Sequence, residues 1–275
     1  MHDLQFTKTH QYRFLKTIYQ KDDNTSAFFE AFDETEKRRV GIKRVKTERK
    51  HLNATKSEAN MIYQVSSMTT NIPAVYHTYY DQDSEFFYMV MQYIEGGKTL
   101  RDYIKVHKQL RQHIQIMIQL CDILIPLHKK RIQHRDLKPE NILVKGRDVY
   151  LIDYNLTARV PFKGEGTEYY QAPEQGSYVE RIGSDRTDLF SLGVLLYELG
   201  TGETPQVGNH YNIPYEGQAW EDFVNPKEIN GEIPDKLNEI IKKCMKYNPE
   251  ERYRDAYELK GELISVLRGG KKHGR

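Results

Sequence analysis

Three side chains in the run from His134 to Asn141 have the chemistry that phosphoryl transfer requires. Such a reaction needs a carboxylate to orient the attacking hydroxyl, oxygen ligands for magnesium, and a cation against the phosphates. Asp136, Asn141 and Lys138 supply these functions in that order. The run therefore predicts a centre that handles phosphate groups.

Three further residues complete such a centre. Asp153 adds a second carboxylate, and Mg²⁺ prefers a few oxygen ligands together with waters. Lys43 lies in a strand-like apolar run, from which its ammonium group can reach phosphate oxygens. Glu58 lies on the helical stretch that follows and can pair with Lys43 to hold it in place. We expect these groups to act as one site.

The first part of the chain must position Lys43 and Glu58, and it is rich in strand formers. A helix is expected at 53–68, where Ala59, Ile62 and Val65 recur at helical spacing. Gly96 and Gly97 then break the pattern and indicate a linker. The expected strands are 12–19, 27–32, 39–45, 74–80 and 85–93.

The second part must position the catalytic run, and it is mainly helical. Thr99 and Asp102 resemble a capping box that opens a short helix. A turn at 145–148 separates two short strands at 142–144 and 149–152. Four further helices are expected at 114–127, 189–199, 234–247 and 255–267. Gly200 and Gly202 are expected to end the helix at 189–199.

Strands first and helices second predict an α+β fold with two segregated lobes. The expected organisation is one domain over residues 1–275, with an N-lobe at about 1–94 that is small, strand-rich and has one main helix. A hinge follows at 95–98, then a larger helical C-lobe at 99–268 and a flexible tail at 269–275. A cleft between two lobes is the default place for a ligand.

The composition excludes several classes of partner. The 275 residues are 38% hydrophobic and 29% charged with a net charge of +2, which is typical of a soluble globular protein and gives no indication of a nucleic-acid partner. No apolar run reaches membrane-spanning length, and no signal peptide is visible.

Cys121 and Cys244 make no disulfide framework, so we expect buried, reduced thiols and a cytoplasmic location. Nothing in the sequence indicates the oligomeric state.

Taken together, these motifs resemble the eukaryotic-type protein kinase family over nearly the whole chain. The run His134 to Asn141 matches the family's H-R-D-L-K-P-E-N loop at every position. Residues 40–43 resemble its V-A-I-K strand, residues 153–155 stand where it has D-F-G, and residues 172–174 match A-P-E. The resemblance implies that Arg252 pairs with Glu174. It also implies that His134 has a packing role and that Asp188 holds the backbone of the catalytic loop.

The resemblance also implies roles, a nucleotide and a substrate class. Asp136 would orient the substrate hydroxyl or accept its proton, and Lys138 would contact the transferred phosphate. Thr167 would bond both, and together with Lys138 it is typical of serine/threonine kinases that act on protein substrates. ATP and Mg²⁺ are the expected cofactors. The residues expected around the nucleotide are Phe28, Gly41, Lys43, the gatekeeper Met91, the hinge residues Gln92, Tyr93 and Ile94, and Leu143.

The sequence departs from the family where the glycine-rich loop should be. Residues 17–26 contain no glycine, although glycine lets backbone amides approach phosphates closely. We expect a solvated hairpin tip there and a weakened affinity for nucleotide. Phe28 replaces the usual valine and Gly41 replaces the usual alanine. We interpret the larger and the smaller side chain as one paired change that conserves the volume of the pocket.

The D-F-G position and the activation segment also depart from the family. Asn155 replaces the glycine, and asparagine tolerates left-handed backbone conformations. Tyr154 replaces the phenylalanine and adds a hydroxyl that needs a partner. The only other hydroxyl residue before Gly166 is Thr157, and Lys163 stands where many kinases carry a phosphorylated threonine. Glu165 is a candidate anion for Arg135, so we expect activity without phosphorylation of this segment.

Two other functions stay open at this point. A pseudokinase or scaffold with weak nucleotide binding is favoured by the missing glycines, but it usually lacks at least one of the catalytic residues present here. A small-molecule phosphotransferase of the aminoglycoside type shares the H-x-D-x-x-x-x-N loop, and Lys138, Thr167 and the A-P-E residues argue against it. A secreted effector acting in a host cytosol is a further possibility for the location.

Overall fold

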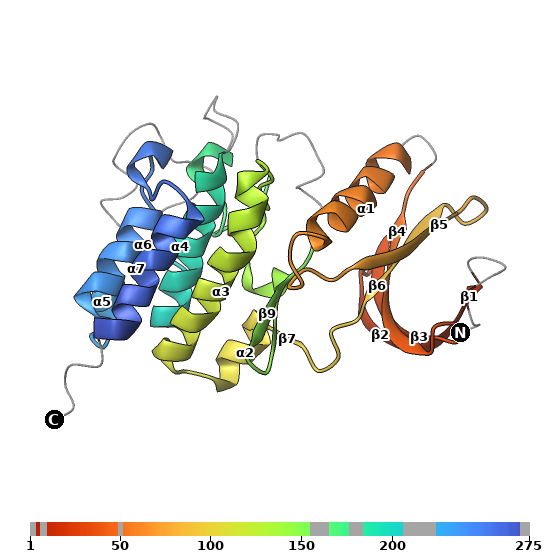
Figure 1. Cartoon of the computed structure of the whole chain (residues 1–275), viewed down its shortest axis with the longest axis horizontal. Helices are drawn as coiled ribbons and strands as arrows, with labels where there is room; N and C mark the ends of the chain where they lie inside the picture. The colour runs from red at the N-terminus through yellow and green to blue at the C-terminus, as the bar shows by residue number, and fades with distance from the viewer. Residues whose placement is uncertain are drawn as a thin grey trace. The chain divides into compact units, whose positions relative to one another are not determined.

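The computed structural model describes residues 4–5, 10–48, 52–154, 165–175, 184–205 and 224–269 (Figure 1). Within these ranges the chain divides into two compact units, and the division falls between Gly97 and Lys98. The first unit contains a large sheet and one helix, and the second is mainly helical, as expected for an α+β fold. In the described part of the chain, no helix is both long and apolar enough to cross a membrane.

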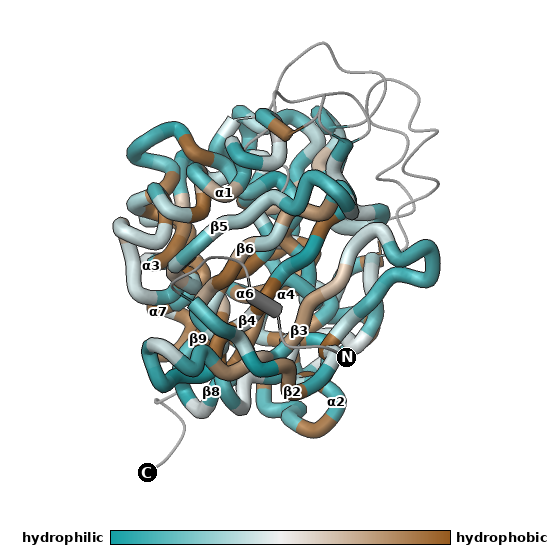
Figure 2. The backbone as a smooth tube through the Cα atoms, turned by 90° about the vertical axis from the view of Figure 1, so that its right-hand side faces the viewer, coloured by the Kyte–Doolittle hydropathy of each residue, from teal (hydrophilic) through white to brown (hydrophobic). Residues whose placement is uncertain are grey.

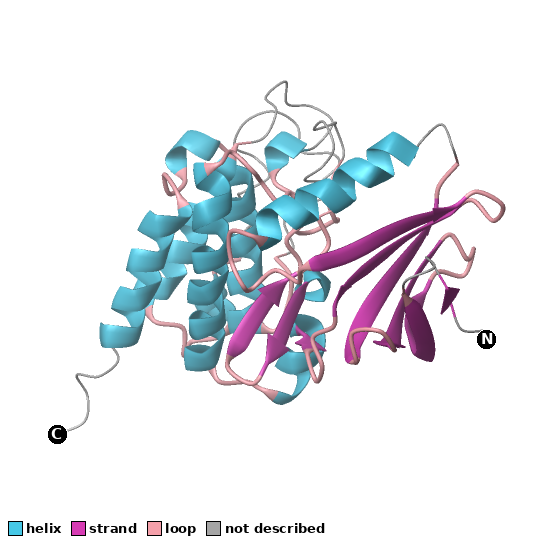
Figure 3. Ribbon diagram, turned by 45° about the vertical axis from the view of Figure 1, so that its right-hand side comes forward, coloured by secondary structure: helices cyan, strands magenta, loops and turns pink. Residues whose placement is uncertain are grey.

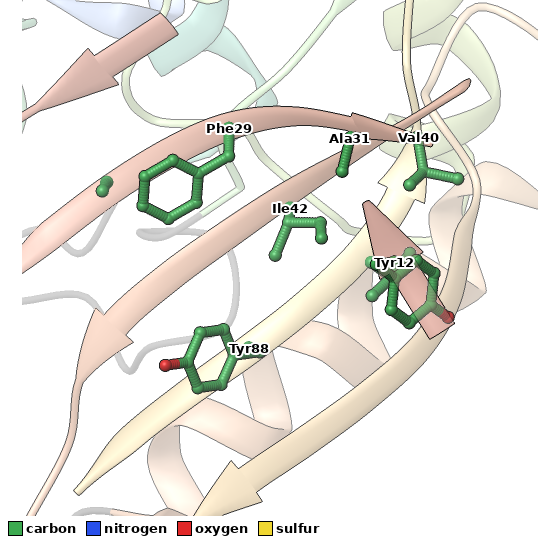
Figure 4. Packing of buried hydrophobic residues seen from close by; sticks show 8 residues of the cluster. Tyr12, Phe29, Ala31, Val40, Ile42 and Tyr88 are labelled. Atoms are coloured by element: carbon green, nitrogen blue, oxygen red, sulfur yellow. The ribbon is translucent and has the colours of Figure 1, made fainter. Parts of the chain in front are cut away.

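The first unit contains an antiparallel sheet in the order β1-β2-β3-β4-β6-β5. Buried residues of β2, β3, β4 and β6 pack together on it, among them Tyr12, Phe29, Val40 and Tyr88 (Figure 4). The turns between the strands are hydrophilic (Figure 2). Helix α1, Leu52–Ser66, packs against β5 and β6. The strands are β1 Leu4–Gln5, β2 Gln11–Gln20, β3 Ser26–Asp33, β4 Arg38–Lys46, β5 Val75–Asp81 and β6 Phe86–Gln92.

The second unit is built around four helices, α3, α4, α6 and α7, which pack side by side (Figure 3). A small sheet in the order β7-β8-β9 lies beside α3. Thr99 caps α2 as predicted, because its Oγ1 accepts a bond from the Asp102 amide at 3.1 Å. The elements are β7 Lys98–Thr99, α2 Leu100–Val106, α3 Leu110–Lys129, β8 Ile142–Lys145, β9 Asp148–Leu151, α4 Asp185–Thr201, α5 Pro226–Ile229, α6 Asp235–Cys244 and α7 Ala256–Gly269.

The predicted elements are present, and several of their ends differ. Helix α4 begins at Asp185, four residues before the predicted start, because Ser184 and Thr187 form a capping box. The prediction that Gly200 ends this helix is wrong, since Gly200 is helical and only Gly202, with φ +86°, forms the left-handed cap. Gly269 was placed in the tail but is the last residue of α7. Strands β1 and β7 and helix α5 were not predicted, because they are only two to four residues long.

Candidate active site

In the first unit, Lys43 and Glu58 form the predicted ion pair. Lys43 lies on β4 and its Nζ donates to Glu58 Oε1 on α1 at 2.8 Å. Both side chains are largely buried, with 18% and 9% of their surfaces exposed. A charge-assisted bond in such a site is stronger than one on the surface. The pair therefore holds the ammonium group of Lys43 in one place on the sheet.

Phe28 and Gly41 lie together on the same sheet and depend on each other. Phe28 is paired with Lys43 across β3 and β4, so Gly41, two residues before Lys43, is its diagonal neighbour. A Cβ added at Gly41 would lie 2.4 Å from Cζ of Phe28, which is a severe overlap. This contact supports the interpretation that the larger and the smaller residue compensate each other in volume.

The turn between β2 and β3 is an exposed hairpin tip, as predicted. Three of its backbone amides bond within the turn: Lys21 N to Ser26 O and Asn24 N to Lys21 O, both at 2.9 Å, and Thr25 N to Asp23 Oδ1 at 3.0 Å. The bonds from Thr25 also lower the pKa of Asp23, so this carboxylate is an anion at neutral pH. These amides are already paired and an acid stands beside them, so the turn lacks the open amide cradle of a glycine-rich loop.

The predicted gatekeeper and hinge residues lie at the end of β6 and just after it. Met91 and Gln92 are its last two residues and lie opposite Gly41 and Val40 of β4. Ile94 is buried, and its carbonyl accepts a bond from Gly97 N at 3.0 Å. All three residues therefore belong to the first unit.

The buried carboxylate of Glu30 ties this segment to the sheet. It accepts a bond from Arg39 at 2.6 Å, forms an ion pair with Lys16 at 3.4 Å and bonds the hydroxyl of Tyr93. Burial and the bond to Glu30 raise the pKa of Tyr93. Arg39 also forms an ion pair with Glu95 at 3.2 Å. Residues 93–95 are thus held by β3 and β4, a role of Glu30 that the sequence did not reveal.

In the second unit, Asp136, Lys138 and Thr167 form one hydrogen-bonded group. Thr167 Oγ1 donates to Asp136 Oδ1 at 2.6 Å, and Lys138 Nζ donates to Thr167 Oγ1 at 2.7 Å. Lys138 Nζ also lies 3.1 Å from Asp136 Oδ2. The carboxylate, the ammonium group and the hydroxyl thus meet at one point, as the sequence predicted.

Asn141 and Asp153 carry the kinds of oxygen atom that Mg²⁺ prefers. The amide nitrogen of Asn141 donates to Asp136 O at 2.9 Å and to Asp136 Oδ2 at 3.2 Å, so its Oδ1 is the atom left for a metal. The Ile152 amide donates to Asn141 O at 2.9 Å, which brings the next residue, Asp153, close to Asn141. An amide oxygen with a carboxylate oxygen, completed by waters and phosphates, is the ligand set that Mg²⁺ prefers.

The buried carboxylate of Asp188 fixes the backbone of the catalytic loop. Its two oxygens accept bonds from His134 N at 2.9 Å and Arg135 N at 2.8 Å, and His128 Nε2 lies 2.8 Å from Oδ2. Burial alone would raise the pKa of Asp188, but the bond and charge of His128 and the loop amides lower it, so it is an anion. Arg135 can therefore keep its unusual backbone, with φ +65°. The role predicted for Asp188 is confirmed.

Arg135 has the internal anion that the sequence suggested. Its Nη1 donates to both oxygens of Glu165, at 3.0 and 3.1 Å. Both side chains are almost fully buried. Gln171 and Gln175 bond the carbonyls of Glu165 and Arg135, at 2.7 and 2.8 Å. The end of the activation segment is therefore attached to the catalytic loop by a carboxylate of the chain itself.

Glu174 and Arg252 form the predicted pair, with two parallel bonds. Arg252 Nη1 donates to Oε1 at 2.7 Å and Nη2 to Oε2 at 2.8 Å. Thr187 donates to the same carboxylate at 2.9 Å. The remaining Arg252 donors bond backbone carbonyls at 186, 246 and 247. The pair thus joins the A-P-E segment to α4 and to the loop before α7.

A second network around Arg101 was missed from the sequence. Arg101 of α2 donates to Glu140 at 2.8 Å, to the Tyr170 hydroxyl at 2.8 Å, and also to Glu198. The Tyr170 hydroxyl in turn donates to Glu198 at 2.6 Å. Burial and this bond raise the pKa of Tyr170, so the hydroxyl stays a donor. Arg101 and Glu198 are 97 positions apart, and no local pattern marks such a pair.

The remaining candidates have simpler surroundings. Leu143 lies half-buried on β8. His134 packs its ring edge-on against Tyr154, with 4.9 Å between the centroids, and its Nε2 lies 3.1 Å from Ile152 O, which confirms its packing role. Thr157, Asn155 and Lys163 lie outside the described residues.

Tyr154→Phe is expected to stabilise the protein and to raise its free energy of unfolding by about 1–3 kcal/mol. This is the usual cost of a buried polar group without a partner, and the substitution removes such a group. Tyr154 is buried, and its hydroxyl makes no hydrogen bond with any described residue. Burial raises the pKa of this hydroxyl, so the group stays neutral. Urea unfolding measures the change, and Tyr257→Phe, at an exposed position on α7, is the matched control. A less stable Tyr154→Phe variant would show that the hydroxyl has a partner.

Comparison with known proteins gives one consistent result. A family model described as the protein kinase domain matches residues 24–260. A probable serine/threonine-protein kinase of Clostridium acetobutylicum is 31% identical over 88% of this chain and 38% of its own length. Another of Clostridium perfringens is 37% identical over 65% of this chain and 27% of its own. Serine/threonine-protein kinase PknB of Mycolicibacterium smegmatis is 33% identical over 66% of this chain and 31% of its own length. The chain thus spans about a third of the length of these relatives.

Proposed function

Since the chain belongs to the protein kinase domain family, we propose that it transfers the γ-phosphate of ATP to serine and threonine hydroxyls of proteins. The observation that carries this proposal is the group of Asp136, Lys138 and Thr167, which are joined by bonds of 2.6 and 2.7 Å. The curated relatives named above are serine/threonine-protein kinases, which agrees with it. The two units then serve as lobes of one domain, with the N-lobe at about 1–94, the hinge at 95–98 and the C-lobe at 99–268.

Each residue has a defined task in this reaction. The carboxylate of Asp136, held by the Thr167 hydroxyl, accepts a hydrogen bond from the substrate hydroxyl and aims it at the γ-phosphorus. Lys138 lies beside the same carboxylate and neutralises charge on the transferred group. Lys43, held by Glu58, binds phosphate oxygens of ATP. Asn141 and Asp153 would hold Mg²⁺, which supplies charge neutralisation to the phosphates.

The nucleotide site has two further features under this proposal. Residues 28, 41 and 91–94 of the first unit take the adenine end, and the role of Leu143 stays a prediction. Because the hairpin tip uses its amides internally, nucleotide affinity rests more on Lys43 and Mg²⁺ than in kinases with a glycine-rich loop. The protein acts in the cytoplasm, or in a host cytosol if the chain belongs to a secreted effector.

Incubation of the pure protein with Mg²⁺ and labelled ATP tests the proposal. Label is expected on phosphoserine or phosphothreonine of generic protein substrates, and not on sugars or aminoglycosides. Nucleotide binding without any transfer would instead identify a pseudokinase. Transfer to aminoglycosides alone would identify a small-molecule phosphotransferase.

We also propose that activity does not require phosphorylation of the activation segment. Glu165 already supplies the anion that bonds Arg135, and both side chains are buried. Phosphatase treatment is therefore expected to leave kcat unchanged, whereas Glu165→Gln lowers it several-fold because Arg135 loses its counter-charge. Peptide kinase assays before and after phosphatase treatment measure the first effect. The same assay on wild type and Glu165→Gln measures the second, with Glu168→Gln as the control variant. Loss of activity on phosphatase treatment, restored by phosphorylation at Thr157, would contradict the proposal.

A further inference from the structure

Two histidines and an aspartate from three separate parts of the first unit lie together. His10 precedes β2, Asp33 ends β3 and His77 lies on β5. Their side-chain ligand atoms all lie within 4.8 Å of one another. Asp33 pairs with Arg38 at the start of β4, five residues before Lys43. At about 3.3 Å per residue, the cluster is about 17 Å along the strand from the Lys43 position. It is therefore distinct from the phosphate-binding residues.

The pairing of β2 with β3 brings two of these residues together. Tyr12 is paired with Asp33, and Glu34 N donates to Gln11 O at 2.9 Å, which continues the ladder beyond the strand end. Because side chains alternate along a strand, His10 shares a face with Tyr12 and Asp33. The rings of His10 and His77 lie only 4.1 Å apart between centroids. Backbone pairing therefore places His10 beside Asp33, and the contact between the two imidazole rings adds His77 of β5 to them.

Asp33 is the best evidence that this cluster binds something. Its side chain is completely buried. Its Oδ1 accepts bonds from Thr35 N at 2.9 Å and Glu36 N at 3.1 Å, which fixes the turn between β3 and β4. Its Oδ2 has no hydrogen bond in the described part of the chain, and it lies 3.7 Å from His10 Nδ1, with which it forms an ion pair only when the imidazole is protonated. A buried carboxylate oxygen left in this state is costly, and a cation at this position would satisfy it.

We propose that His10, Asp33 and His77 bind one divalent transition-metal ion, with Zn²⁺ as the preferred metal. Two imidazole nitrogens and one carboxylate oxygen are a common ligand set for Zn²⁺, whereas Mg²⁺ and Ca²⁺ prefer oxygen ligands alone. With bonds of about 2.0–2.2 Å, tetrahedral ligands lie about 3.4 Å apart, so closure needs shifts of only about 1 Å. A water would take the fourth position.

The surroundings of the cluster are compatible with a cation. Burial lowers the pKa of His77, and the charges of Arg38 and Glu36 act on that pKa in opposite directions. The Arg38 guanidinium lies over the ring of Tyr76, 3.6 Å from its centroid. The ion would join the segment before β2, the end of β3 and strand β5. It would therefore act as a structural link within the first unit, without a part in phosphoryl transfer.

Titration of the pure protein with Co²⁺ and Zn²⁺, in excess Mg²⁺ to fill oxygen-ligand sites, tests this inference. We expect one Co²⁺ to give visible d–d absorption bands that Zn²⁺ removes, and Zn²⁺ to raise the melting temperature. His77→Gln and His10→Gln should each weaken binding at least tenfold and abolish the thermal shift. His107→Gln, which removes an exposed histidine of the second unit, should behave like wild type.

Three outcomes would overturn the inference: no Co²⁺ bands in the wild type, wild-type affinity in both cluster variants, or a spectrum with thiolate charge-transfer bands. His10 lies just before the first residue of β2, so His10→Gln decides the question even if His77→Gln fails to fold. Circular dichroism of the metal-free variants separates loss of binding from loss of structure. Because none of these measurements uses phosphoryl transfer, their result is independent of the proposed kinase activity.

Discussion

Asp136→Asn is expected to lower kcat for peptide phosphorylation by about 10²- to 10⁴-fold, the usual contribution of a positioned acid or base. The variant keeps the size of the side chain, and its oxygen can still accept the bond that Thr167 now donates at 2.6 Å. It loses the negative charge that faces Lys138 and the ability to take the substrate proton. The KM for ATP should change little, because Lys43 and Glu58 remain intact. Steady-state assays with peptide and labelled ATP measure both constants.

Asp148→Asn is the matched control for this prediction. Asp148 is an exposed aspartate at the start of β9, only a few residues from the catalytic loop in sequence. The same change of charge there should leave kcat within about twofold of wild type, as expected for a surface substitution away from the site. If Asp136→Asn retained wild-type kcat while folded, Asp136 would not be the catalytic carboxylate and the proposed mechanism would fail.

Arg252→Met is expected to lower the free energy of unfolding by about 3–5 kcal/mol, the cost of breaking a buried ion pair by removing one partner. Arg252 is completely buried and Glu174 is 3% exposed, so solvent screens neither group. Among the described residues, the substitution leaves the carboxylate of Glu174 with Thr187 as its remaining side-chain donor. It also leaves three backbone carbonyls without the donors that Arg252 gave them. Urea unfolding at low temperature measures the loss.

Two further variants decide whether the loss comes from the buried charge. Arg254→Met, two positions along, removes an arginine whose side chain is 72% exposed and should leave stability close to wild type. The double variant Arg252→Met with Glu174→Leu should recover part of the loss, because it removes the uncompensated carboxylate as well. A double variant less stable than both single variants would show that the backbone bonds of Arg252 matter more than its charge pair.

Most of the individual site residues were predictable because their signals are local. Asp136, Lys138 and Asn141 lie in one short run, and the turn geometry of the loop brings them together. Thr99 and Asp102 interact within one helical turn, so their capping pattern can be read from the sequence. The hairpin tip between β2 and β3 was also predictable, because residues such as Asp23, Asn24 and Ser26 favour turns.

Other features could not be read in this way, because they depend on packing. Gly200 interrupts an apolar helical pattern and suggests an end, yet it stays helical because its missing Cβ makes room for Ile233, whose Cδ1 lies 3.0 Å from that position. Glu30 looks like an ordinary strand glutamate, and only the folded sheet shows that it is buried. Ser184 and Thr187 match the sequence pattern of a capping box, which marks the start of a helix. The apolar run after them is a stronger helical signal, so the predicted start of α4 came too late in the sequence.

The run from His134 to Asn141 predicted the proposed chemistry by itself, because the types and spacing of its charged groups are those that phosphoryl transfer needs. Only the tertiary structure decided how that run is held. Asp188 fixes its backbone from 54 positions away, and Glu165 pairs with Arg135 from 30 positions away. Burial of these charges removes water and makes each contact specific, and burial is a property of the whole fold. The sequence therefore names the groups that react, and the packing of the chain decides which groups position them.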